Sequence, residues 1–200
     1  MQEHEDQNVP QQVEGKKLDI VETREFTDKE AAYAAFERAR EKLLALNSWH
    51  ELAGNVSAVF TLKDKFGRPV ARMPEVGDYV MIDIPGPSPA YGHGYDWVTV
   101  VKLEDRAADG YVMLSLKPSP PPDEKDSNTV AHFFSSHSST SLIVALTANK
   151  LQVSYYGRNE TINTDNKAIV DDIRNLFVGF GAKLGLSHPQ WKKLVLGILG

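Results

Sequence analysis

The sequence of 200 residues predicts an α+β fold, in which a curved antiparallel sheet of about seven strands grips a long C-terminal helix and an extra short terminal helix follows. Three observations support this prediction. Seven segments have the alternation or β-rich composition of strands, and helical periodicity appears after the first strand and again near the C-terminus. Six of the strands follow one another through short turns, which makes the sheet largely antiparallel. A sheet of this size with an amphipathic helix at each end tends to curl around one of them.

The first strand and helix are expected at the start of the folded region. Apolar and polar residues alternate from Lys16, as in a strand with one buried face. Thr27 and Glu30 have the spacing of a capping box, which predicts that a helix starts at Thr27. Apolar residues then recur every three or four positions, at Ala32, Phe36, Ala39, Leu43 and Leu46. We expect the helix to end at Asn47 and Trp49 to lie in a short connection.

The remaining strands are expected at 56–62, 80–84, 96–104, 110–117, 140–146 and 151–157. The last two form the clearest hairpin, with Asn149 available for a positive-φ position in its turn. Proline-rich sequence predicts loops at 85–97 and 118–127. The pattern leaves open whether residues 128–140 contain a strand.

Two helices are expected after Thr161. The apolar stripe of the long one consists of Ile169, Ile173, Leu176, Phe177, Phe180 and Leu184, and Gly185 is suited to ending it. Ser187 and Pro189 are suited to starting the short one. Its apolar face, formed by Trp191, Leu194, Val195, Ile198 and Leu199, could dock on a partner or a second copy, or on the protein's own sheet.

The order strand, helix, meander, helix resembles the START-like, or polyketide-cyclase-like (SRPBCC), helix-grip superfamily. The segment KLDIVETREFTDKEAAYAAFERA is similar to its opening strand and first helix, and Trp49 lies where such chains often carry a tryptophan. The resemblance spans 16–184 in element order and departs from the pattern at 118–140 and 188–199. It implies an internal cavity, which in relatives takes sterols, lipids, polyketides or other apolar molecules.

Composition and charge indicate the domain organisation and exclude several classes of ligand. Hydrophobic residues make up 42% and charged residues 24%, which predicts a single START-like domain over 16–200 after a disordered polar tail over 1–15. The net charge of −5 without a basic cluster disfavours nucleic acids, and no apolar run is long enough for integral membrane association. There is no cysteine, and the spacing of His132 and His137 supports neither a metal site nor a general base, so no metal and no cofactor is predicted. The N-terminus has no export signal, which favours a cytoplasmic protein.

Two groups are candidates for ligand contacts. Tyr91, His93, Tyr95 and Trp97 lie among glycines and could form a lid that stacks on an apolar ligand, although Tyr95 and Trp97 could simply begin a buried strand. Arg158 could bind a carboxylate or phosphate head group, or could pair with Glu160 on the same strand face.

The sequence therefore favours a non-catalytic binding or carrier module for a small hydrophobic or amphipathic molecule. Trp49, Tyr95, Trp97 and Tyr155 would supply apolar walls, with Arg158 at the polar end. One alternative is a cyclase, dehydratase or isomerase that uses the same cavity, in which His93 or Tyr91 moves a proton. The other is a protein-interaction domain, with a homodimer formed through the C-terminal helix.

Overall fold

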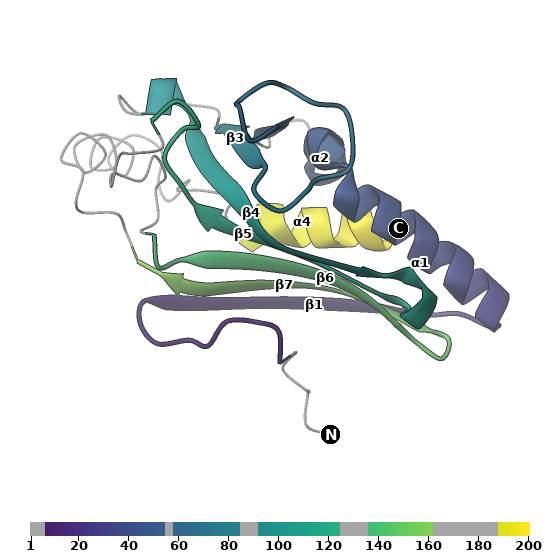
Figure 1. The fold of residues 1–200 in the computed structure, drawn as a ribbon. Coiled ribbons are helices and arrows are strands. Elements are labelled where there is room, and N and C mark those ends of the chain that lie inside the picture. The colour runs from purple at the N-terminus through teal and green to yellow at the C-terminus, as the bar shows by residue number, and fades with distance from the viewer. Residues whose placement is uncertain (1–6, 55–57, 85–91, 125–135, 162–187) are drawn as a thin grey trace.

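The computed structural model describes residues 7–54, 58–84, 92–124, 136–161 and 188–200 (Figure 1). These residues include seven strands in one antiparallel sheet of order β1-β7-β6-β5-β4-β3-β2, which confirms the predicted sheet. The strands are β1 (Lys16–Glu25), β2 (Val59–Lys63), β3 (Tyr79–Asp83), β4 (Asp96–Arg106), β5 (Tyr111–Pro118), β6 (Ser139–Thr147) and β7 (Lys150–Glu160). The first strand thus pairs with the last, and the others follow as a meander.

The longer described helices, α1 (Lys29–Leu44) and α4 (His188–Leu199), and the short α2 (Trp49–Ala53) cover one face of the sheet (Figure 1). We call this the inner face and the opposite one the outer face. Three 3₁₀ turns, at Leu46–Ser48, Gly92–Gly94 and Ala107–Asp109, complete the described helical elements. None of the described helices has the length and apolar character required to cross a membrane.

The first helix begins one residue later than the predicted capping box. Asp28 is the N-cap, and its Oδ1 accepts a hydrogen bond of 2.7 Å from the amide of Ala31. The Thr27 hydroxyl donates instead to the carboxylate of Asp28 at 3.1 Å. A carboxylate caps amides well and also interacts favourably with the positive end of the helix dipole, so the aspartate takes the position expected for Thr27.

The expected short connection after α1 is helical. Trp49 starts α2 and is fully buried, and its indole N–H donates to the Leu43 carbonyl at 3.1 Å. This bond satisfies one of the carbonyls that the last turn of α1 leaves without a helical partner. The Trp49 ring packs edge-on against Phe60 of β2, with ring centroids 5.2 Å apart. Trp49 therefore joins the helical layer to the sheet.

The core lies between the inner face and the helices. Alternate strand residues enter it, as Phe60, Leu62, Val98 and Val100 illustrate. Leu194, Val195 and Ile198 of α4 are fully buried in the same core, and α4 contacts β1, β7, α1 and α2. The apolar face of the last helix thus docks on the protein's own sheet, which leaves these three side chains unavailable for the suggested homodimer contact. The longer helix predicted from the stripe Ile169 to Leu184 lies outside the described residues.

The N-terminal segment 7–15 crosses to the outer face of the sheet (Figure 1). Val9 packs against a small apolar cluster of Met113, Ile143 and Tyr156. The Asn8 side chain accepts a hydrogen bond of 2.8 Å from Lys102. Composition predicted a disordered tail over 1–15, whereas residues 7–15 have specific contacts in the structure.

The β6–β7 hairpin is confirmed, but its turn uses a different residue. Ala148, not Asn149, has the positive φ, at 56°. Asn149 instead holds the end of β1, because its carbonyl accepts from the Phe26 amide at 2.9 Å and its side-chain amide donates to the Phe26 carbonyl at 2.6 Å. A tertiary contact thus decides the roles of the two turn residues.

Candidate ligand-binding site

A cavity of about 60 Å³ lies between the inner face of the sheet and α4. Every strand from β2 to β7 has residues in or beside its wall. The apolar lining residues are Phe60, Ile82, Ile84, Val98, Leu116, Pro118 and Trp191, and the polar ones are Asp96, Ser138, Ser139, Thr140, Tyr155 and Glu160. The site thus combines apolar walls with a few polar groups, as small-molecule sites commonly do.

The volume limits what the cavity can hold. A water molecule needs roughly 10–15 Å³ of such space, and an engineered cavity of about 150 Å³ binds benzene. The cavity of about 60 Å³ therefore has room for a few heavy atoms, such as a short chain or one end of a larger molecule.

Tyr155 and Trp191 form one side of this cavity. Their ring centroids are 4.3 Å apart and the rings are tilted by 30°, so the α4 indole lies over the tyrosine of β7. Tyr155 is almost completely buried, and its hydroxyl donates to Oε1 of Glu160 at 3.2 Å. The tyrosine is thereby fixed at both its ring and its hydroxyl.

Glu160 faces the cavity because β7 contains an irregularity near its end. In the pairing with β1, Gly157 is opposite Leu18 and Glu160 is opposite Lys16, so β7 has one residue more than β1 in this interval. Asn159, within it, has a φ of 54°. Such a bulge interrupts the alternation of side chains and can redirect one of them. Glu160 therefore lies on the inner face with Tyr155.

Gly157 leaves the space that the Glu160 carboxylate occupies. A methyl group at this position would collide with Oε1 of Glu160 and would lie 3.1 Å from the Tyr155 hydroxyl. The glycine is thus required for close approach and not for a positive φ.

The environment disfavours ionisation of both polar groups. Burial raises the pKa of Glu160, while the Tyr155 hydrogen bond and the charges of Lys16 and Arg158 act in the opposite direction. Burial also raises the pKa of Tyr155 well above its ordinary value, and the charge of Glu160 adds to this effect. The tyrosine is therefore a neutral hydrogen-bond donor, and ionisation of the Glu160 carboxyl group is less favourable than in water.

Arg158 does not form the polar end of the cavity. Its side chain is completely buried on the outer face, where it forms an ion pair with Asp19 and lies 5.2 Å from the ring centre of Tyr156. Strand alternation predicted that Arg158 and Glu160 share a face, and the bulge at Asn159 makes that prediction wrong.

Among the seven candidate residues, Tyr155 lines the cavity. Trp49 belongs to the core. Trp97 is the second residue of β4, and its side chain lies on the outer face, 5.8 Å from Lys63 Nζ, since its neighbour Val98 points inward. Tyr95 is half-buried outside the lining, and His93 is exposed with its Nε2 3.0 Å from Asp123. Tyr91 lies outside the described residues.

Asp96, Glu160 and Trp191 line the cavity but were not predicted from the sequence to do so. Asp96 is two positions before Val98 on an alternating strand, and this spacing already assigns it to the inner face. Trp191 precedes the buried Leu194 by one helical turn. No local pattern indicates the bulge that redirects Glu160.

No family model and no curated protein matches the sequence. The structure is similar to that of a hypothetical protein from Helicobacter pylori, with a TM-score of 0.53 and 9% identity over 92% of this chain and 86% of that chain. Weaker similarities include an aromatase/cyclase from Streptomyces (TM-score 0.44, 10% identity, 92% and 93% of the chains). Norcoclaurine synthase from Thalictrum flavum in complex with dopamine and hydroxybenzaldehyde has a TM-score of 0.45 and 9% identity over 96% and 94% of the chains.

Sequence identities of 9–10% are evidence of a similar fold and of nothing more. The order of the elements and the closure of β1 on β7 define the START-like helix-grip fold that the sequence resemblance implied. The helix that the described residues place on the inner face is α4, which the sequence predicted as an extra helix after the long one. The similarity to the Helicobacter pylori protein along most of both chains supports the same architecture.

Proposed function

We propose that this protein is a binding or carrier module for a small apolar or amphipathic molecule. The observation that carries the proposal is the cavity between the sheet and α4, whose walls are apolar and whose polar groups include the Tyr155–Glu160 pair. Apolar walls favour removal of a hydrocarbon group from water, and the few polar groups orient the ligand. The ligand, or the part of it that enters, has the size of a few heavy atoms.

Cavity filling tests the proposal. Ile84 lines the cavity and is only partly buried, so Ile84→Trp can fill the space with a limited effect on the core. Val59→Trp adds the same side chain at an exposed position of β2 that does not line the cavity. Xenon suits this volume as a probe, because it enters small apolar cavities.

We expect xenon to shift amide resonances of the lining residues in the wild-type protein and in Val59→Trp, and to shift them far less in Ile84→Trp. Native mass spectrometry of the full chain, followed by denaturing extraction, then identifies any small molecule that co-purifies with it. A protein that carries no molecule and shows no xenon shifts at the lining residues would contradict the proposal.

The second candidate function is that of an enzyme. The observation that favours it is that titratable groups, Glu160 among them, line the cavity. The Glu160 carboxylate could take a proton from a carbon of the substrate and return it to another carbon, so that a double bond moves without oxidation or reduction. His93, the first sequence-based choice for this role, is exposed and bonded to Asp123. Deuterium incorporation from D₂O into the extracted molecule, lost in Glu160→Gln, would distinguish this function from carriage alone.

A further inference from the structure

The geometry points to a ligand that carries an ammonium group, which enters this cavity and donates hydrogen bonds to the Glu160 carboxylate beside the Tyr155 hydroxyl. The inference rests on the proposed function, since it names the chemical class of the ligand for the same cavity. The sequence predicted instead a ligand with an anionic head group bound by Arg158.

The charged side chains among the described lining residues are carboxylates. Glu160 and Asp96 both line it, and Asp96 is only 7% exposed. Arg158, the fully buried cation nearby in sequence, has its guanidinium on the outer face in an ion pair with Asp19. An ionised carboxylate only accepts hydrogen bonds, and an ammonium group only donates them. Among the described residues that line the cavity, Glu160 thus presents a carboxylate that is complementary to a cation.

Glu160 is also held in position before a ligand arrives. The bulge at Asn159 directs it to the inner face, Gly157 leaves room for it, and the Tyr155 hydroxyl donates to Oε1. This bond uses one of about four acceptor positions of a carboxylate, so others remain for a ligand. A fixed acceptor loses little conformational entropy on binding.

Burial of Glu160 makes binding of a cation beside it more favourable. A carboxylate that is partly removed from water is unfavourable until a cation compensates it, and burial raises the pKa of Glu160 accordingly. Among the described residues, Tyr155, Lys16 and Arg158 are the titratable groups that act on Glu160, and Asp96 lines the same cavity. A ligand ammonium inside the cavity would add attraction at short range, and the indole of Trp191 in the wall would add a cation–π contribution.

Three small probes of matched shape test the inference: n-butylammonium, 1-butanol and butyrate. Each is titrated at neutral pH into the full-length protein, with the indole N–H resonance of Trp191 as the readout. Charge-assisted hydrogen bonds are worth more than neutral ones, so we expect n-butylammonium to bind at least about tenfold more tightly than 1-butanol, and butyrate to bind most weakly.

Glu160→Gln keeps the size of the side chain and removes its charge, so we expect it to abolish the preference for n-butylammonium while 1-butanol still binds. Glu25→Gln, an exposed site at the end of β1, is the matched control and should keep the preference. Gly157→Ala retains Glu160 but forces its carboxylate to move, and should also reduce the preference.

The titrations distinguish a failure of cavity binding from a failure of the ammonium preference. If none of the three probes binds, the proposed cavity function fails and the inference fails with it. If 1-butanol binds but n-butylammonium binds no more tightly, or if both Glu160→Gln and Gly157→Ala retain the preference, the inference is overturned and cavity binding stands.

Discussion

Asn159 determines which face of the sheet its neighbours occupy. Its φ of 54° accompanies the extra residue in β7, so Arg158 and Glu160 lie on opposite faces despite their spacing of two. The positive φ at Ala148 similarly reverses the expected role of Asn149. Both sequence-based predictions failed for the same reason. Local pattern indicates which residues tolerate a left-handed conformation, whereas tertiary hydrogen bonds select the one that adopts it.

Glu160 provides a prediction about stability and pH. Burial raises its pKa above the ordinary value of 4.5, so the folded state is favoured below that value and loses this contribution as the pH rises through the folded pKa. Glutamine has no ionised form and can still accept from Tyr155. We therefore expect Glu160→Gln to have a higher Tm than the wild-type protein at about pH 7, with the difference vanishing near pH 4.

Thermal unfolding followed by circular dichroism at both pH values measures this difference. Glu25→Gln, which removes an exposed charge, should change the Tm little at either pH. A Glu160→Gln protein that is less stable than the wild type at neutral pH would show that ionised Glu160 gains more from Lys16 and Arg158 than it loses by burial.

At the scale of the elements, the periodicity of apolar residues correctly predicted the helices and strands whose apolar positions are buried. The α1 stripe and the strand alternation were found because their apolar positions face the core, and burial of those positions is the main source of stability. The predicted start of α1 differs from the observed one by one residue, and the connection predicted at Trp49 is a short helix. Caps and short helices depend on individual hydrogen bonds, which the periodicity does not indicate. The apolar face of α4 was evident in the sequence, but its partner was not.

The docking of α4 on the sheet gives an element-scale prediction. Leu194 is fully buried between the helix and the inner face, so Leu194→Ala should lower the free energy of unfolding by about 2–5 kcal/mol. Leu196, two residues later, is 43% exposed, and Leu196→Ala should change it by less than about 0.5 kcal/mol. Urea unfolding measures both variants. Equal effects would mean that α4 does not pack through this face.

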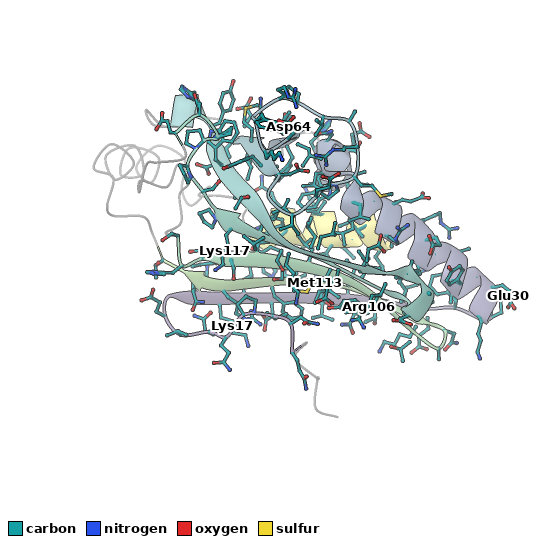
Figure 2. All side chains as sticks on the ribbon, in the orientation of Figure 1. Lys17, Glu30, Asp64, Arg106, Met113 and Lys117 are labelled. Atoms are coloured by element: carbon teal, nitrogen blue, oxygen red, sulfur yellow. The ribbon has the colours of Figure 1, made fainter. Side chains whose placement is uncertain are left out.

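At the scale of the whole molecule, the number of strands and their antiparallel order were predictable, since short turns leave few other topologies. The family resemblance implied an internal cavity. Its lining did not follow from the sequence, because four of the predicted side chains are in the core, on the outer face or exposed: Trp49, His93, Trp97 and Arg158. Aromatic and charged residues mark candidate sites, but only the three-dimensional structure shows which face each of them occupies. Figure 2 shows that side chains extend from both faces of the sheet.

The N-terminal segment is the least expected part of the molecule, and it contacts the bulge directly. The Asn159 amide donates to the Gln12 side chain at 2.9 Å, and the Asn159 side chain accepts from the amides of Val13 and Glu14 at 2.7 and 3.2 Å and donates to the Gln11 carbonyl at 3.1 Å. These contacts lie on the outer face, one residue away from the acid in the cavity. The segment therefore supports the conformation that directs Glu160 inward.

Gln12→Ala removes the acceptor for the Asn159 amide, and we expect it to lower the free energy of unfolding by about 0.5–1.5 kcal/mol. It should also weaken n-butylammonium binding, since the bulge is less firmly held. Gln11 contacts Asn159 through its backbone carbonyl, so Gln11→Ala preserves that contact and is the matched control. Urea unfolding and the Trp191 titration measure the two effects. If both variants bind the probe as the wild type does, Gln12 has no part in positioning Glu160.

The bulge also has a thermodynamic consequence. The two sides of the sheet share one residue, so if attachment of the segment stabilises the inward position of Glu160, the coupling free energy between segment and cavity has the same value in both directions. A molecule that favours the inward position of Glu160 must then favour, to the same extent, the attachment of residues 11–14 on the far side of the sheet. Asn159 is the residue through which such a coupling would act.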